Sequence, residues 1–222
     1  MKPTLTHSDL IPIAKRFCEA FGKKHHSSLY GVTDGKAIGT FVEQEFKKYI
    51  STKFDTDIGN SANGLDLPAI NTDIKVTLSK QPQSSCPYKD SKQKIYGLGY
   101  NLLLFVYEKQ DFENEQTSLL KFCSCTYISA ERTGDYQTTT GIHSILNNKG
   151  NSDDIFAFLC ERMIPADEVT LTKLADEILH NPPPTGYLTI SNALQWRLQY
   201  KRVISLQEDV EGIIPIVKKT CS

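Results

Sequence analysis

Two acidic residues and a lysine stand close together in the first half of the 222-residue chain. Six residues separate Asp66 from Asp73, and one apolar residue separates Asp73 from Lys75. Residues 72–78 read as a strand, so Asp73 and Lys75 project from one face while Ile74 points into the core. Two carboxylates can hold a hard divalent cation, and an ammonium group beside them can steer a water molecule or steady a phosphate. Together these residues could carry out metal-assisted phosphodiester hydrolysis.

The alternative for this stretch is an edge strand with a solvated Asp–Lys face, because Asp-x-Lys alone is very common. The context upstream favours chemistry. Apolar residues recur at steps of three and four through residues 36–51, which predicts a helix with one apolar stripe. Glu43 lies at the border of that stripe, so its carboxylate would be partly buried and would need a partner such as Lys75 or a metal-bound water. An ordinary solvated glutamate on an amphipathic helix is the other interpretation.

The combination resembles a known family of nucleases. The helix carries two glycines before its glutamate, and the two acids, a proline, the lysine and a threonine follow: Gly35, Gly39, Glu43, Asp66, Pro68, Asp73, Lys75 and Thr77. This arrangement is similar to the MutH-like DNA endonucleases, which include GATC-cutting restriction enzymes and belong to the PD-(D/E)XK superfamily. The likeness covers about a third of the chain. It departs from the family in having Asp73 where MutH has Glu, and in an insert at residues 80–87.

The resemblance implies roles for individual residues. Asp66, Asp73 and the carbonyl of Ile74 would bind one or two Mg²⁺ ions, and Lys75 would be the catalytic lysine. Glu43 would complete the cluster. The segment around Lys94 is similar to the family's lysine-bearing segment before its next strand, which makes Lys94 a candidate accessory active-site lysine.

The resemblance also implies an activity. We expect a sequence-specific, Mg²⁺-dependent type II restriction endonuclease that hydrolyses double-stranded DNA. A homodimer is expected, because a small chain with one active site must pair to cut both strands, and a cognate DNA methyltransferase is expected genetically rather than as a bound partner. The alternatives are a MutH-like enzyme that nicks one strand, a non-cleaving DNA-binding module on the same fold, and a metal-dependent hydrolase acting on another substrate.

Size and composition indicate the number of domains and the class of protein. The chain is expected to form a single nuclease domain over 1–222, with a catalytic core at about 30–130 and a C-terminal helical part at about 140–222 for DNA binding or dimerisation. No apolar run reaches membrane-spanning length, and the six cysteines are expected to be free thiols, which predicts a bacterial-type cytoplasmic protein. The net charge is −1, but residues 75–107 hold five lysines against one acid, a basic lobe suited to phosphates.

The order of elements predicts an α/β fold with a restriction-endonuclease-like core, in which helices flank a central mixed sheet. Helices are expected at 9–22, with Ser8 as N-cap, at 36–51, near 90–97, at 152–163 and at 167–180. Strands are expected near 65–69, 72–78, 102–107 and 119–129, with a loop at 59–64. The continuous apolar run at 102–107 is typical of a strand that is buried on both faces.

DNA contacts are expected from three polar clusters, because base edges and phosphates are bound by amide, hydroxyl and basic side chains. One cluster follows the catalytic strand as a loop, one is a loop at 131–138, and one contains Arg197 and Lys201 at helical i, i+4 spacing. The alternative for each is a solvated loop or helix face, and Trp196 and Tyr200 are expected to be core residues. The candidates are Lys80, Gln81, Gln83, Ser84, Ser85, Arg132, Gln137, Arg197 and Lys201.

Overall fold

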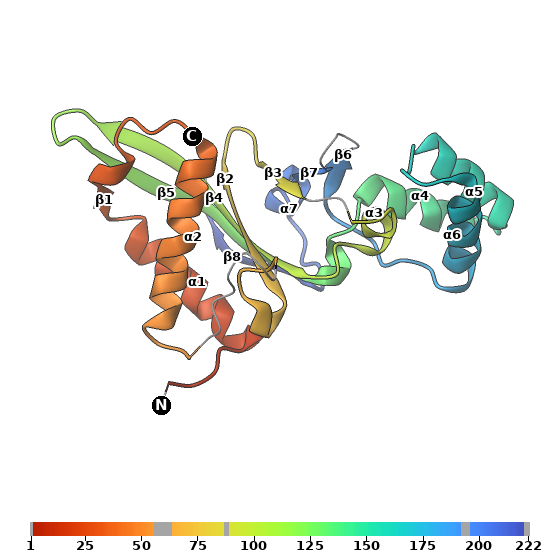
Figure 1. The fold of residues 1–222 in the computed structure, drawn as a ribbon, viewed down its shortest axis with the longest axis horizontal. Coiled ribbons are helices and arrows are strands. Elements are labelled where there is room, and N and C mark those ends of the chain that lie inside the picture. The colour runs from red at the N-terminus through yellow and green to blue at the C-terminus, as the bar shows by residue number, and fades with distance from the viewer. Residues whose placement is uncertain (1, 56–63, 87–88, 192–195, 220–222) are drawn as a thin grey trace. The chain divides into compact units, whose positions relative to one another are not determined.

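The computed structural model describes residues 2–55, 64–86, 89–191 and 196–219 (Figure 1). It comprises two compact units, each made of segments that are separate in the sequence. The first unit is Met1–Pro82, Asn101–Ile128 and Asp209–Ser222, and the second is Gln83–Tyr100 and Ser129–Glu208. The loop expected at 59–64 lies, up to residue 63, outside the described residues. A single nuclease domain over 1–222 stays a prediction.

The first unit is built on a mixed five-stranded sheet, as the sequence predicts. The strands run in the order β1, β5, β4 and β2, and β8 also pairs with β5. β2 and β4 are parallel, while the other pairings are antiparallel. Their bounds are His25–His26 (β1), Thr72–Leu78 (β2), Asn101–Phe112 (β4), Thr117–Ile128 (β5) and Ile213–Lys218 (β8). The fold class inferred from the sequence is confirmed.

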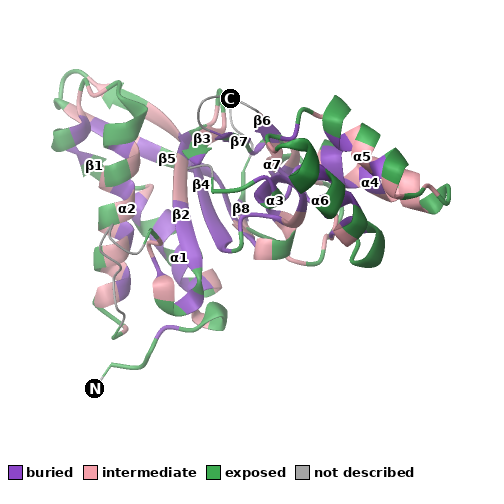
Figure 2. Ribbon diagram, turned by 45° about the vertical axis from the view of Figure 1, so that its right-hand side comes forward, coloured by how far each residue is buried: buried purple, intermediate pink, exposed green. Residues whose placement is uncertain are grey.

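Strand β4 is the central support of this sheet. All of its residues from 101 to 107 are buried, which confirms the prediction of a strand covered on both faces, and Figure 2 shows this stretch in the colour of buried residues. β4 holds β2 in parallel register, with Asp73 opposite Leu102 and Lys75 opposite Leu104. β2 is therefore at an edge of the sheet, where its other side is open to a different partner.

Helices α1 (His7–Phe21) and α2 (Gly35–Ser51) pack against this sheet (Figure 1). α2 begins at Asp34, whose carboxylate accepts a hydrogen bond from the N–H of Lys36 at 2.9 Å. Its buried side chains recur every fourth position, at Ile38, Val42, Phe46 and Ile50, as one stripe facing the core.

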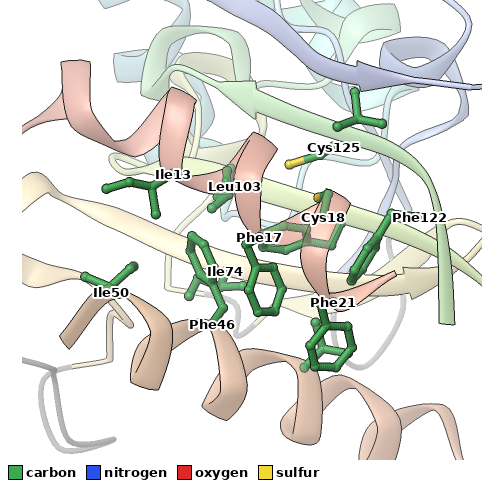
Figure 3. Close-up of a cluster of buried hydrophobic side chains, with 14 of the residues drawn as sticks. Ile13, Phe17, Cys18, Phe21, Phe46, Ile50, Ile74, Leu103, Phe122 and Cys125 are labelled. Atoms are coloured by element: carbon green, nitrogen blue, oxygen red, sulfur yellow. The ribbon is translucent and has the colours of Figure 1, made fainter. Parts of the chain in front are cut away.

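Aromatic packing fixes the helices on the sheet. Figure 3 shows Phe17 of α1 and Phe46 of α2 beside Ile74 and Leu103 of the strands. The ring centroids of Phe46 and Phe105 lie 5.1 Å apart, and those of Phe46 and Phe17 lie 5.0 Å apart. This core sets the position of α2, which carries Glu43, relative to β2, which carries Asp73 and Lys75.

Two local expectations in this unit are wrong. α1 is capped by Thr6 rather than Ser8, and the Thr6 hydroxyl and the Asp9 carboxylate form a reciprocal capping box. Residues 65–69 do not form a strand. Pro68 opens a short 3-10 helix, Pro68–Ile70 (η2), because it has no N–H for a strand ladder. The remaining short helix of this unit is Ser27–Leu29 (η1).

The second unit pairs a small sheet with a helical cluster. The sheet has the order β3 (Gln83–Cys86), β7 (Trp196–Gln199) and β6 (Thr189–Ser191), and both pairings are antiparallel. Helices α4, α5 and α6 share a buried apolar core. The helices expected at 152–163 and 167–180 are confirmed, whereas α4 and the three strands were not predicted. The helices are Lys92–Tyr96 (α3), Ala130–Arg132 (η3), Tyr136–Asn147 (α4), Ser152–Glu161 (α5), Glu168–His180 (α6) and Lys201–Ile204 (α7).

The expectation that all six cysteines are free thiols is wrong. Cys18, Cys86, Cys125 and Cys160 are free, but Cys123 is disulfide-bonded. Cys221 lies outside the described residues. Disulfide pairing depends on the distance and direction of two Cβ atoms in the folded chain, so the number and spacing of cysteines did not reveal it. Among the described residues, no helix combines the length and apolarity needed to cross a membrane.

Candidate active site at the edge of β2

A tight reversal of the chain brings Asp66 back beside β2. Leu67 and Thr72 form an antiparallel bridge, with N–H···O distances of 2.9 and 3.1 Å in the two directions. Asn71 makes the reversal possible with a left-handed backbone, at φ 46°. Extending this antiparallel register by one residue places Asp66 opposite Asp73. The reversal thus makes Asp66 and Asp73 direct neighbours, although six residues separate them in the sequence.

Asp66 is held in place by the backbone of the edge strand. Its Oδ2 accepts a hydrogen bond from the N–H of Ile74 at 2.8 Å. The expected separate strand before β2 is therefore replaced by a carboxylate that binds the open side of β2. This contact fixes the Asp66 side chain, because a buried backbone N–H needs a partner and the carboxylate supplies it.

Asp73 and Lys75 lie on the same face of β2, as alternation predicts. The Lys75 Nζ lies 2.6 Å from Asp73 Oδ2. The Asp73 residue is only 7% exposed, and Lys75 is partly buried. Ile74, between them, packs in the apolar core with the helices. One strand thus contributes both a carboxylate and an ammonium group to the site while its intervening residue anchors it.

Glu43 joins the cluster through a lysine that sequence reasoning missed. The Lys47 Nζ lies 2.7 Å from Glu43 Oε1 and 2.6 Å from Asp66 Oδ1. The side chain of Lys47 is 14% exposed, so this bridge between two carboxylates is largely shielded from water. The signal was present in the sequence, because Lys47 follows Glu43 at the i, i+4 spacing of helical ion pairs. The partners expected for Glu43 were Lys75 or a metal-bound water.

Electrostatics sets the two aspartates apart. Burial raises the pKa of Asp73 to about 6, together with its hydrogen bond to Asp66 and against the opposing effect of Lys75. Burial also acts to raise the pKa of Asp66, but hydrogen bonds with Asp73, Glu43, Lys47 and the Ile74 N–H lower it to about 2. Asp66 is thus ionised at any ordinary pH, while Asp73 exchanges its proton near neutrality.

The other two members respond to the same crowding. Burial and the neighbouring Asp66 raise the pKa of Glu43. The pKa of Lys47 is raised because its bonds to Asp66 and Glu43 outweigh the effect of burial. With all groups ionised, the three carboxylates outnumber the two ammonium groups and leave a net negative charge. A site of this kind attracts a further cation.

The donor set fits a hard divalent cation. Asp66, Asp73 and the Ile74 carbonyl supply only oxygen atoms, which Mg²⁺ prefers. Lys47 and Lys75 now engage oxygens of Asp66 and Asp73, and the part of the chain that the structure describes holds no cluster of three or more Asp, Glu, His or Cys already arranged as a metal cage. A bound cation would therefore share these carboxylates with the ammonium groups or displace them.

The expected accessory lysine lies in the other unit. Lys94 is a buried residue of α3, and its carbonyl accepts a hydrogen bond from the N–H of Asp135 at 2.8 Å. Burial lowers the pKa of Lys94, although Asp135 acts in the opposite direction. Its role as an accessory active-site lysine stays a prediction.

The expected DNA-contact residues fall on several elements. Lys80 and Gln81 are exposed in the turn after β2, but Gln83, Ser84 and Ser85 belong to strand β3 rather than to a loop. Neighbouring serines of β3 differ in environment. The Ser84 hydroxyl lies 2.5 Å from the hydroxyl of the fully buried Tyr200, whereas Ser85 is exposed.

The remaining candidates are placed differently from the sequence expectation. Arg197 and Lys201 do not share a helix face: Arg197 is in strand β7 and Lys201 opens helix α7. An alternation of apolar and polar residues outweighs the i, i+4 spacing here. Arg132 donates to the Thr185 carbonyl at 3.3 Å, and Gln137 accepts a hydrogen bond from Arg162 at 3.1 Å. Trp196 and Tyr200 are core residues, as predicted.

Comparison with known proteins finds similarity to one family of restriction enzymes. The family model described as type II restriction enzyme NspV matches residues 4–215. The chain is also 53% identical over 190 residues to a protein of Nostoc sp. named type II restriction enzyme NspV, and the match covers 86% of each chain. No solved structure matches.

Proposed function

Because this chain belongs to the NspV family of type II restriction enzymes, we propose that it cleaves double-stranded DNA with Mg²⁺ held at the edge of β2. The family membership makes the chain a site-specific deoxyribonuclease, and the proposal concerns how its residues perform that reaction. The observation that supports it is the convergence of Asp66, Asp73 and Lys75 with the helix residue Glu43. A PD-(D/E)XK relationship is part of the same proposal.

Asp66, Asp73 and the carbonyl of Ile74 are the proposed ligands of one or two Mg²⁺ ions. When bound, Mg²⁺ would supply Lewis-acid stabilisation of the negative charge that develops on the scissile phosphate. The fixed position of Asp66 against the Ile74 N–H keeps one ligand oriented before any substrate arrives. Such orientation matters because a preorganised group needs no rearrangement during the reaction.

Lys75 is the proposed catalytic lysine. Its ammonium group lies next to the Asp73 carboxylate, so it can position the attacking water and offset the charge that builds up on the phosphate oxygens. Glu43 is proposed to act through Lys47, keeping that ammonium group available to balance Asp66. Lys94 is proposed as an accessory active-site lysine on the family resemblance alone.

Several further points rest on the reaction class. Cutting both strands at one site suits a homodimer with two active sites. A cognate DNA methyltransferase would protect the host's own sites, and the enzyme would meet invading DNA in the cytoplasm. The remaining polar candidates for DNA contact are Lys80, Gln81, Gln83, Ser85, Arg132, Gln137, Arg197 and Lys201.

Plasmid digestion tests the proposal. The protein is incubated with supercoiled plasmid and Mg²⁺, and a parallel reaction contains EDTA. Discrete linear fragments that form only with Mg²⁺ are the expected result. Nicked circles alone would indicate a MutH-like strand-nicking enzyme, and a gel shift without cutting would indicate a non-cleaving DNA-binding module. Equal cutting with EDTA would contradict the proposed Mg²⁺ dependence.

A further inference from the structure

The small sheet of the second unit presents two rows of polar side chains on one face. In register, Gln199 of the central strand β7 lies between Gln83 and Thr189, and Arg197 lies between Ser85 and Ser191. Directly opposite residues of antiparallel strands share a face, so these six side chains form one patch. We name Gln83, Ser85, Thr189, Ser191, Arg197 and Gln199 the polar grid.

The opposite face of the same sheet packs inward. Leu198, Trp196 and Ile190 are each no more than 2% exposed, and Ser84 is bonded to Tyr200. In contrast, Arg197, Gln199 and Ser85 are exposed. This two-sided pattern holds β7 firmly from behind while its polar side chains stay accessible to solvent.

The chemistry of the polar grid fits base edges. The three strands contain no acidic residue, and Arg197 is their single charged residue. An arginine can donate two hydrogen bonds to guanine O6 and N7, and a glutamine can bond adenine N6 and N7. The B-DNA major groove, about 12 Å wide, admits a β-ribbon. Neutral donors around one cation also suit a polyanion better than a mixed-charge surface would.

A sheet face that only contacts solvent would be expected to carry more charged side chains. Side chains that face water on the surface of a soluble protein are often charged, because Lys, Glu, Arg and Asp are mostly exposed. The edge strands β3 and β6 carry neither charge nor proline. Their exposed positions hold amide and hydroxyl groups, which are adaptable hydrogen-bonding groups rather than solubilising charges.

We propose that the polar grid reads base edges in the major groove of double-stranded DNA, with Arg197 and Gln199 as specificity-determining residues. The proposal rests on the proposed function as a DNA endonuclease and deepens it by assigning the recognition surface. Gln199, Thr189 and Ser191 thereby join the expected contacts, and Ser84 leaves them.

Binding measurements with two duplexes test this proposal. The recognition site is first mapped by sequencing the ends of wild-type fragments. Dissociation constants are then measured for a duplex with the mapped site and for a scrambled duplex, with Ca²⁺ replacing Mg²⁺ so that the DNA stays intact. Arg197→Ala and Gln199→Ala should each reduce the ratio of the two affinities by about 5- to 150-fold, the range for loss of one bidentate base contact.

Matched variants separate base reading from charge. Arg197→Lys keeps the charge but loses the planar fork, so it should lose discrimination almost as fully while binding to the scrambled duplex stays near wild type. Arg16→Ala on the exposed side of α1 and Gln207→Ala, also exposed, are controls that should leave the ratio unchanged. Circular dichroism spectra establish that each variant is folded.

Two results would overturn the proposal. One is a wild-type affinity ratio in the folded Arg197 and Gln199 variants. The other is an equal loss of affinity for both duplexes, which would make the two residues phosphate contacts without base reading. Failure of the proposed function has a separate signature, because the wild-type protein itself would then produce no discrete Mg²⁺-dependent fragments.

Discussion

The edge of β2 and the polar grid are two polar regions built on opposite principles. At the edge of β2, five charged side chains are at most 30% exposed and engage one another within 2.6 to 2.7 Å. On the polar grid, the side chains are mainly uncharged and partly or fully exposed to solvent. Stabilising charge at a reacting phosphate needs groups that are fixed before the substrate binds. Reading a base sequence instead needs exposed donors and acceptors whose bound water the base edges can replace. Residues at the edge of β2 should therefore control the rate of DNA cleavage. Residues of the polar grid should control the DNA sequence at which cleavage occurs.

Asp66→Asn should give the largest effect on the first region. The amide oxygen can still accept the Ile74 N–H, so the fold should persist, but the charge that would hold the cation is lost. We expect the single-turnover cleavage rate to fall by about 10³-fold or more, the scale for removing a principal charge-stabilising group. The ratio of affinities for mapped and scrambled duplexes should not change. Asp153→Asn, at an exposed aspartate of α5, is the control, and an Asp66→Asn protein that cut at a tenth of the wild-type rate would remove Asp66 from the metal site.

Lys47→Met tests whether the first region is held together by internal ion pairs. Without this ammonium group, Glu43 and Asp66 lose their shared cation, and we expect the free energy of unfolding in EDTA to fall by about 2–4 kcal/mol. Addition of Mg²⁺ should stabilise the variant more than it stabilises the wild type, because no lysine then competes for the Asp66 oxygen. Chemical denaturation with and without Mg²⁺ measures both effects.

Lys48→Met is the matched control for this variant. Lys48 is the next residue on α2, but its side chain is 72% exposed and pairs with Glu45 instead. Its loss should change stability by less than about 0.5 kcal/mol. Equal stability of the two methionine variants would show that the Lys47 bridge does not stabilise the cluster.

The raised pKa of Asp73 predicts a particular dependence of stability on pH. A carboxyl group whose pKa is about 6 in the folded protein and near 3.8 when unfolded binds its proton more tightly in the folded state. The free energy of unfolding in EDTA should therefore fall as the pH rises from about 4 to 6, by about 2 kcal/mol from this group. Asp73→Asn cannot titrate and should lack this slope. Parallel profiles for wild type and variant, measured by urea unfolding, would contradict the assignment.

The adjacent serines Ser84 and Ser85 of β3 should respond differently to substitution by alanine. Ser84→Ala removes the bond to the buried Tyr200 hydroxyl and should lower the free energy of unfolding by about 1 kcal/mol, with no change in DNA discrimination. Ser85→Ala, on the polar grid, should leave stability within about 0.5 kcal/mol and weaken discrimination modestly. Thermal unfolding and the two-duplex assay together decide the matter. An exchange of these two phenotypes would reverse the assignment of the faces.

The arrangement at the edge of β2 was accessible from the sequence because most of its geometry is local. Alternation along 72–78 was enough to put Asp73 and Lys75 on one face, and the apolar stripe of α2 located Glu43 near them. Asp66 was assigned to a strand that does not exist, since the reversal depends on Pro68 and on the left-handed backbone of Asn71. The spacing of the two acids, rather than periodicity, singled out Asp66, and the family resemblance then implied its role as a metal ligand.

In the second unit the helices α5 and α6 were predicted, but the sheet was missed because it is assembled from distant, very short strands. Ser84 and Tyr200, which bond across it, are 116 positions apart, and β6 has three residues. Strands of this length leave too few residues to establish a period. The alternation of Trp196, Leu198 and Tyr200 with polar residues was present, but the i, i+4 spacing of Arg197 and Lys201 was given more weight. Lys47 was missed for a different reason, because an i, i+4 lysine on a helix is usually a surface ion pair.

Single-turnover cleavage of a duplex carrying the mapped site, compared between Lys75→Ala and Lys48→Ala, shows whether the edge of β2 is the catalytic centre. We expect Lys75→Ala to lower the rate by about 10²- to 10³-fold while the folded protein still binds the duplex, and Lys48→Ala to cut at the wild-type rate. A Lys75→Ala protein that cut as fast as the wild type would contradict the assignment of the edge of β2 as the catalytic centre.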